Sequence, residues 1–108
     1  MELSSRVVLV TAGGSGIGLA IAHHFYNKGD RVHICDIDQS TIDNAACEMP
    51  DVTSTCADLT DTEQVDKVFR DLKETHGQLD ILINNVGVAG PAAAVEAILP
   101  NNLYNLQM

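Results

Sequence analysis

Short apolar runs alternate with amphipathic segments through most of this 108-residue chain. The apolar runs are rich in β-branched residues and show little polar alternation, which is typical of parallel strands buried on both faces. The segments between them repeat apolar residues at helical spacing. This pattern predicts strands at residues 6–11, 31–36, 52–57 and 80–84, and helices at about 15–28, 40–49 and 61–76.

Residue types at the expected helix ends support these boundaries. Gly29 follows the first helix, and Pro50 stops the second. The third helix can begin at Thr60 or Asp61, because either side chain can accept hydrogen bonds from free helix amides, and Gly77 follows it as a C-terminal cap. Each predicted helix therefore has a definite end and a short connection to the next strand.

Repeated strand-helix-strand units predict an α/β fold with a doubly wound parallel sheet and right-handed crossovers. About four strands, in the order 3-2-1-4, make only the first half of such a sheet. We expect the first two helices on one face and the third alone on the other, with the fourth strand as an open edge. A chain with this sheet alone is predicted to be marginally stable, or to bury the exposed surface against a partner such as a second copy.

Composition narrows the partners and the compartment. The formal net charge of −9 argues against binding to nucleic acid or an anionic membrane surface. No apolar run approaches the length of a membrane span, and the N-terminus shows no signal-peptide pattern. The cysteines, Cys35, Cys47 and Cys56, include no C-x-x-C pair and are predicted to be small buried residues in a reducing compartment. A cytoplasmic location is expected.

The most informative segment is a glycine-rich turn between the first strand and the first helix, with glycines at positions 13, 14, 16 and 18. Free amides and the positive dipole end of a helix attract a diphosphate. A Cβ atom would keep the backbone from approaching it. The turn therefore predicts a Rossmann-type dinucleotide site, although the G-x-G-x-x-G spacing is not met and a glycine-rich turn without a ligand is the alternative interpretation.

The spacing Thr-Ala-x-x-x-Gly-x-Gly resembles the T-G-x-x-x-G-x-G motif of the short-chain dehydrogenase/reductase family. Thr11, Gly16 and Gly18 match, while Ala12 replaces the first glycine and would be tolerated if its φ is negative. The resemblance covers about residues 3–97. It implies cofactor contacts throughout the turn, from Thr11, Gly13, Gly14, Ser15, Gly16, Ile17 and Gly18.

Asp36 ends the second strand, 18 positions after Gly18. A carboxylate there can accept hydrogen bonds from the adenosine ribose hydroxyls and would repel a 2′-phosphate. Ser15 and Ile37 stand where a phosphate site would need Arg or Lys. The expected cofactor is therefore NAD(H) rather than NADP(H). Asp38 is expected to be a solvated loop acid or a helix N-terminal residue.

Two further motifs follow the third and fourth strands. The resemblance implies that the carboxylate of Asp58 and the backbone of Leu59 contact the adenine, although a plain turn before a helix explains Asp58 without a ligand. The motif Asn84-Asn85-Val86-Gly87 resembles the family's N-N-A-G, which steadies the central sheet beside the cofactor. We therefore expect residues 1–91 to form a dinucleotide-binding half-domain, followed by an atypical tail at 92–108.

The family's catalytic Ser and its Tyr-x-x-x-Lys pair have no counterparts in this sequence. Tyr26 lies within a predicted helix, Met108 stands four positions after Tyr104, and Lys73 is the last lysine. No catalytic residue is assigned, and whether this chain is itself an enzyme stays open. The resemblance implies the NAD(H)-binding portion of an oxidoreductase acting on a small alcohol or ketone, here truncated. A non-catalytic dinucleotide-binding or partner-binding module is the alternative.

No metal site is expected. His23 and His24 are adjacent and so diverge on a helix, and His33 and His76 have no partners at ligand spacing. The acidic residues at positions 61, 63 and 66 are predicted to form a solvated helix face.

Overall fold

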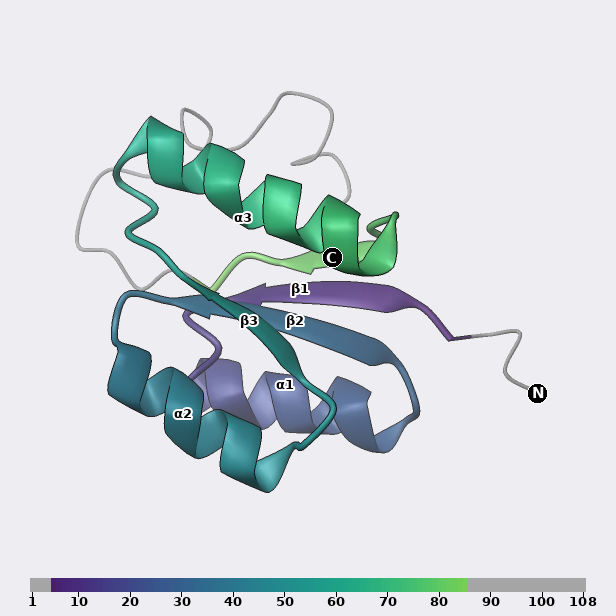
Figure 1. The fold of residues 1–108 in the computed structure, drawn as a ribbon. Helices are drawn as coiled ribbons and strands as arrows, with labels where there is room; N and C mark the ends of the chain where they lie inside the picture. The colour runs from purple at the N-terminus through teal and green to yellow at the C-terminus, as the bar shows by residue number, and fades with distance from the viewer. Residues whose placement is uncertain (1–4, 86–108) are drawn as a thin grey trace.

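The computed structural model describes residues 5–85, and all seven predicted elements are present there (Figure 1). In chain order they are β1 (Val7–Thr11), α1 (Gly16–Asn27), β2 (Arg31–Asp36), α2 (Gln39–Glu48), β3 (Thr53–Cys56), α3 (Thr62–His76) and β4 (Ile81–Ile83). The ends differ from the predicted ones by no more than one residue. Val86, Gly87, the predicted boundary at 91 and the tail lie outside the described residues.

The four strands form one parallel sheet in the order β3-β2-β1-β4, as predicted. The register pairs Val8 with both Val32 and Ile81, and it pairs Asp36 with Cys56. Because all the strands run in the same direction, their carboxyl ends meet at one edge of the sheet. The loops that carry the glycine turn, Asp36, Asp58 and the asparagines therefore leave the sheet at this edge.

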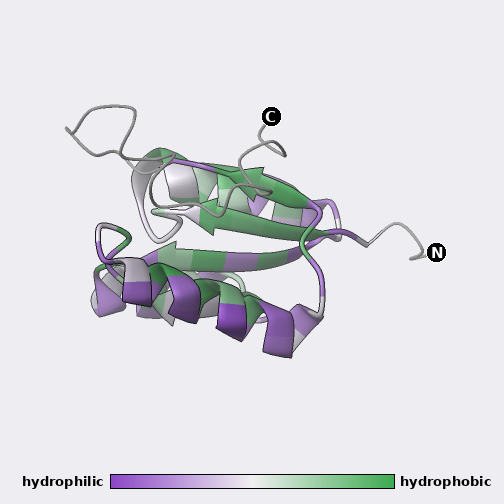
Figure 2. Ribbon diagram, turned by 90° about the horizontal axis from the view of Figure 1, so that it is seen from above, coloured by the Kyte–Doolittle hydropathy of each residue, from purple (hydrophilic) through white to green (hydrophobic). Residues whose placement is uncertain are grey.

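The two faces of the sheet are covered unequally (Figure 1). The helices α1 and α2 lie side by side on one face, and α3 lies on the other. Alternate residues of β1 serve the two cores: Val8 and Val10 face α1 and α2, while Val7 and Leu9 face α3. Figure 2 shows the apolar strands enclosed between helices whose outer faces are polar. For the helices within residues 5–85, the predicted distribution over the two faces is thus confirmed.

The helix ends show which of the capping alternatives holds. Asp61, rather than Thr60, is the N-cap of α3 and accepts a hydrogen bond from the Glu63 amide at 3.0 Å. Gly77 ends this helix in the left-handed conformation, at φ 79°. Asp38 is the N-cap of α2, as expected. Within residues 5–85, no helix is long and apolar enough to span a membrane.

The cysteine prediction is only partly correct. Cys35 is buried beneath α3, and this burial raises the pKa of its thiol to about 12. Cys47 is exposed and Cys56 is half-buried. Cys47 lies on the outer face of α2, two positions after the buried Ala45, so helical periodicity turns its side chain to solvent.

Candidate dinucleotide-binding site

The start of α1 lacks the side-chain cap that the other two described helices have. Its N-cap, Ser15, is extended at φ −155° and makes no side-chain capping bond, and no acidic residue stands in the first turn. The Leu19 amide, bonded to the Ser15 carbonyl at 3.1 Å, closes the first helical turn. The amides before it lie at the positive end of the helix dipole, which favours an anionic ligand.

The glycines of the turn differ in what an added side chain would contact. A Cβ atom on Gly18 would lie 2.0 Å from the Ala12 carbonyl oxygen, and one on Gly13 would lie 2.7 Å from the Ile34 side chain. These positions are therefore required by the packing of the protein itself. Gly16 has a φ of +58° and no neighbouring atom within 4 Å of such a Cβ. Of the positions compared here, Gly16 alone leaves open space at the helix start.

Ala12 departs from the sequence expectation, because its φ is +53°. A negative φ was the condition for tolerating its methyl group, and the turn does not meet it. Ala12 lies where the chain leaves β1 for α1, and it adopts the left-handed conformation in this turn. An L-residue there is strained by about 1–2 kcal/mol.

Thr11 connects the glycine turn to the segment after β4. Its buried hydroxyl accepts a hydrogen bond from the Asn85 amide at 2.7 Å and lies 3.4 Å from the Asn84 side-chain oxygen. The Asn85 side chain also lies beside Gly18, where its nitrogen would be 2.7 Å from an added Cβ. The structure thus brings together Thr11, Gly18 and both asparagines at this edge of the sheet.

Asp36 faces the glycine turn from the end of β2. Its Oδ2 accepts a hydrogen bond from the Gly14 amide at 3.0 Å, and its Oδ1 accepts one from the Asp38 amide at 3.2 Å. A Cβ on Gly14 would lie 2.5 Å from the Thr41 hydroxyl. Thr41 was missed in the sequence, because its place at the start of α2 carries no signal until the turn is folded against it.

Two large apolar side chains are exposed at this same edge. Ile17 is 73% exposed and Ile37 is 67% exposed, and they are the large hydrophobic residues left in solvent within the described part of the chain. One follows Gly16 and the other follows Asp36. Exposed apolar groups beside convergent polar ones are typical of a small-molecule site.

Asp58 and Leu59 lie in the loop after β3, at the same edge. The Asp58 carboxylate accepts hydrogen bonds from the Thr60 hydroxyl at 2.7 Å and the Thr60 amide at 3.0 Å, and these bonds lower the pKa of the exposed carboxyl. Leu59 packs against the core beneath α3. The turn is formed without a ligand, so the geometry accommodates both interpretations of Asp58.

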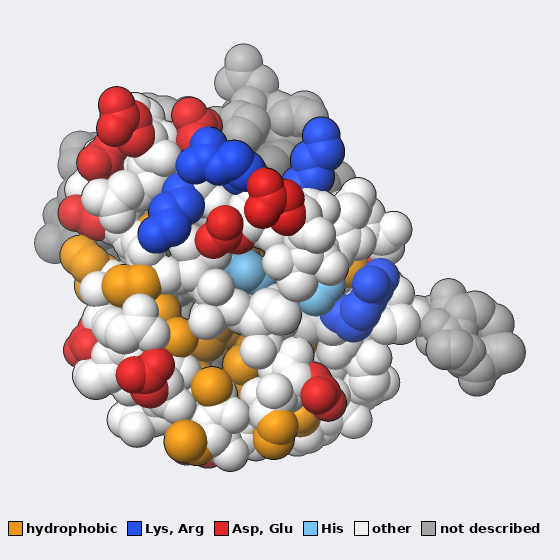
Figure 3. Space-filling view, in the orientation of Figure 1, with side chains coloured by type: hydrophobic (Ala, Val, Ile, Leu, Met, Phe, Trp, Pro, Cys, Tyr) orange, Lys and Arg blue, Asp and Glu red, His pale blue; other side chains and the backbone are white. Residues whose placement is uncertain are grey.

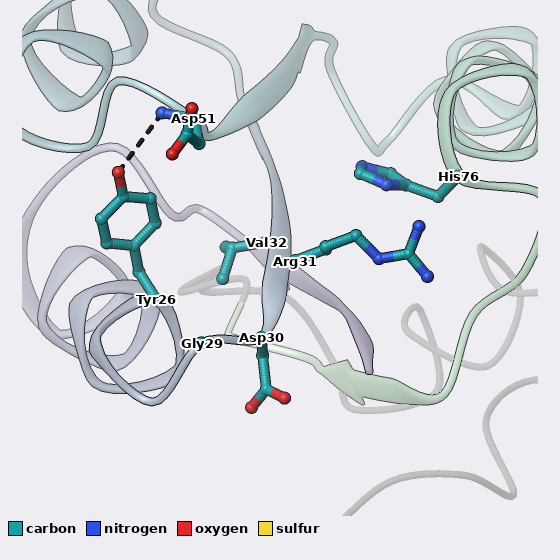
Figure 4. A pocket seen from close by; sticks show the side chains of 7 residues that line it. All are labelled: Tyr26, Gly29, Asp30, Arg31, Val32, Asp51 and His76. Atoms are coloured by element: carbon teal, nitrogen blue, oxygen red, sulfur yellow. Dashed lines mark hydrogen bonds between the residues drawn. The ribbon is translucent and has the colours of Figure 1, made fainter. Parts of the chain in front are cut away.

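The residues present fit a dinucleotide. An uncapped helix start can hold the diphosphate, Asp36 can accept from ribose hydroxyls, and the exposed isoleucines can cover apolar surface of the bases. A hollow of about 490 Å³ lies elsewhere, at the opposite edge of the sheet (Figure 4). It is lined by Tyr26, Gly29, Asp30, Arg31, Val32, Asp51 and His76. It contains no helix start or glycine-rich turn, so it does not belong to this site.

Metal chemistry finds no support in the described residues. Between residues 5 and 85, no group of three or more histidine, cysteine or acidic side chains could hold an ion.

Comparison with known proteins agrees with this geometry. The family model described as short chain dehydrogenase matches residues 6–104. The chain is 37% identical over 95 residues to 1-deoxy-11-beta-hydroxypentalenate dehydrogenase of Streptomyces exfoliatus, covering 84% of this chain and 34% of that enzyme. It is 36% identical over 89 residues to galactitol 2-dehydrogenase of Agrobacterium fabrum, covering 82% and 35%.

Solved structures agree as well. L-sorbose reductase from Gluconobacter frateurii, crystallised with NADPH and L-sorbose, superposes with a TM-score of 0.76 at 30% identity, over 83% of this chain and 36% of that one. The chain thus spans about a third of the length of these relatives. It belongs to the short-chain dehydrogenase family, of which it contains the dinucleotide-binding portion.

Proposed function

We propose that this chain is the NAD(H)-binding half of a dehydrogenase that interconverts a small alcohol and its carbonyl compound. The bound nicotinamide would supply or accept the hydride. The observation that carries the proposal is the start of α1, which has no side-chain cap and has open space at Gly16. The activity and its substrate belong to the whole enzyme, since the relatives are about three times as long.

Each part of the site has a defined task in this proposal. The amides at the start of α1 bind the diphosphate, and Asp36 orients the adenosine ribose. Ile17 and Ile37 exclude water from the two ends of the ligand. Asp58 and Leu59 border the adenine, and the asparagine segment, including Val86 and Gly87, supports the nicotinamide side. Most of the binding surface is thus formed by loops at one edge of the sheet, as in other doubly wound folds.

Asp36 supports a preference for NADH over NADPH. Its carboxylate is directed at the glycine turn by the Gly14 amide, where the adenosine ribose would lie. A 2′-phosphate there would meet this negative charge, and neither Ser15 nor Ile37 provides a cation. L-sorbose reductase was solved with NADPH. In this chain, by contrast, the local charge favours the unphosphorylated ribose.

The cofactor preference can be tested by fluorescence titration with NADH and NADPH. We expect the unmodified protein to bind NADH at least roughly tenfold more tightly, the equivalent of about 1.4 kcal/mol. Asp36→Asn should remove most of this difference. Asp38→Asn is the matched control, since the Asp38 carboxylate accepts from Ser40 at the start of α2, and it should leave the preference unchanged. Equal affinity for both cofactors in the unmodified protein would contradict the role given to Asp36.

A further inference from the structure

Five polar side chains form a continuous hydrogen-bonded chain between α3 and the sheet, away from the dinucleotide site. Thr53 Oγ1 lies 2.8 Å from His76 Nε2 and 2.7 Å from His33 Nδ1. His33 Nε2 lies 2.9 Å from Thr55 Oγ1, which donates to Asp71 Oδ2 at 2.8 Å. We call this set of residues the histidine chain. Figure 3 shows histidine side chains at the surface between α3 and the sheet.

The acceptor at one end fixes the direction of every hydrogen in the chain. An ionised carboxylate can only accept, so the Thr55 hydroxyl donates to Asp71 and accepts from His33 Nε2–H. Neutral His33 then has a bare Nδ1, which accepts from the Thr53 hydroxyl. The Thr53 oxygen in turn accepts from His76 Nε2–H. Both imidazoles are therefore assigned the Nε2-protonated tautomer.

A proton added to His33 conflicts with this order, whereas one added to His76 does not. The new Nδ1–H of His33 would point at the hydroxyl hydrogen of Thr53. Thr53 would have to turn that hydrogen toward the Val32 carbonyl, at the longer distance of 3.4 Å. His76 already donates through Nε2, so its protonation leaves the chain unchanged.

The surroundings of His33 also disfavour a positive charge. The residue is 1% exposed, and its ring meets that of His76 edge-on at 6.0 Å. Burial and His76 lower the pKa of His33 to about 4, while Asp71 opposes the shift. Burial and the positive charge of Arg31 lower the pKa of His76 as well. The neighbouring β1 residue is Leu9, and on β2 itself Cys35 remains a neutral thiol.

We propose that the histidine chain is a pH-sensitive switch, which fastens α3 and β3 to the sheet while His33 is neutral and releases them when a proton binds His33 Nδ1. Through Asp71 and His76, the histidine chain connects α3 to both β2 and β3, and Lys67 Nζ separately donates to the Cys56 carbonyl at 3.5 Å. Two of its members, Thr53 and Thr55, lie on β3, which is an edge strand of the described sheet. Protonation therefore weakens the attachment of the edge strand first.

The switch also has a consequence for the dinucleotide site, which rests on the proposed function. The strand β3 leads directly into Asp58 and Leu59. Release of β3 would loosen that loop, so dinucleotide affinity should decrease over the same acidic range. The tests below use no cofactor, and their outcome is therefore independent of whether the dinucleotide proposal holds.

The first test is side-chain ¹⁵N–¹H NMR of the unmodified protein. We expect both His33 and His76 to be Nε2–H tautomers at pH 7, with His33 staying neutral until pH falls toward about 4. As His33 titrates, amide-exchange protection in β3 and α3 should decrease before that in α1. An Nδ1–H tautomer of His33, or its titration at the ordinary histidine pKa with protection unchanged, would overturn the proposal.

The second test compares urea unfolding at several pH values for the unmodified protein, His33→Gln and the control His24→Gln, which replaces an exposed histidine. The unfolded state binds the proton on His33 more readily than the folded state does. The contribution of neutral His33 to the free energy of unfolding is therefore full above pH 6.5 and is lost as the pH falls toward about 4. This one group should change the unfolding constant roughly 50-fold between pH 7 and pH 4.5. That part should vanish in His33→Gln and persist in His24→Gln. Identical pH dependence in all three proteins would refute the switch, and the NMR result decides if His33→Gln does not fold.

Discussion

At the residue scale, the glycine turn shows where sequence reasoning succeeds and where it stops. Its position and its partner Asp36 were predictable, since both follow strands in a recognisable order. The separate reasons for Gly13, Gly16 and Gly18 were not, because they depend on atoms that approach only in the folded turn. The left-handed conformation of Ala12 was also hidden, since nothing in a sequence specifies φ at a single loop residue.

Ala12→Gly should stabilise the protein by about 1 kcal/mol, because glycine has no Cβ to strain at positive φ. The free energy of unfolding in urea measures this. The matched control is Ala22→Gly, in the buried face of α1, which should be destabilising because it removes a packed methyl and weakens the helix. A loss of stability in Ala12→Gly would show that the methyl group is not strained.

The histidine chain is a second feature at this scale that could not be predicted from the sequence. His33, Thr53 and His76 are separated along the sequence by many residues, and no ligand spacing relates them. Only the parallel register, which pairs His33 with Thr53, and the path of α3 across the same face bring them together. A polar network of this kind is visible only once the topology is known.

At the element scale, the sequence predicted every helix and strand of the described region to within a residue. The signals were strong because each helix has an apolar stripe and a marked end, such as Asp61 and Gly77 on α3. The informative contrast is among helix starts. The helices α2 and α3 are capped by aspartates, whereas α1 starts without a side-chain cap. The proposed dinucleotide site accounts for this difference, because an uncapped helix start leaves its amides available to a diphosphate.

Capping α1 artificially should therefore separate stability from binding. Ser15→Asp places a carboxylate at the helix start, and we expect it to stabilise the free protein by roughly 0.5–1 kcal/mol. The same charge should weaken NADH binding at least roughly tenfold through repulsion of the diphosphate. Unfolding in urea and NADH titration measure the two effects.

Ser15→Asn provides the matched control, because it can cap the helix without adding charge. It should stabilise the protein similarly and reduce binding much less. If Ser15→Asp bound NADH as well as the unmodified protein does, the diphosphate could not lie at the start of α1.

At the scale of the whole molecule, the sheet is covered by α1 and α2 on one face and by α3 on the other (Figure 1). In the described region β4 pairs with β1 alone. This arrangement and its strand order were predictable from strand-helix alternation, because crossover handedness leaves few alternatives. The reaction and its substrate were not, since the chain spans about a third of its relatives.

The central claim is that a dinucleotide binds with its diphosphate at the start of α1. Backbone ¹H–¹⁵N NMR during NADH titration tests it most directly, since the three helix starts serve as internal comparisons. We predict the largest shifts at Gly13–Leu19, with further shifts at Asp36 and Ile37, and little change at Ser40 and Glu63 beside the aspartate caps. Shifts confined to the hollow around Tyr26, Arg31 and His76, or no shifts at saturating NADH, would contradict the account.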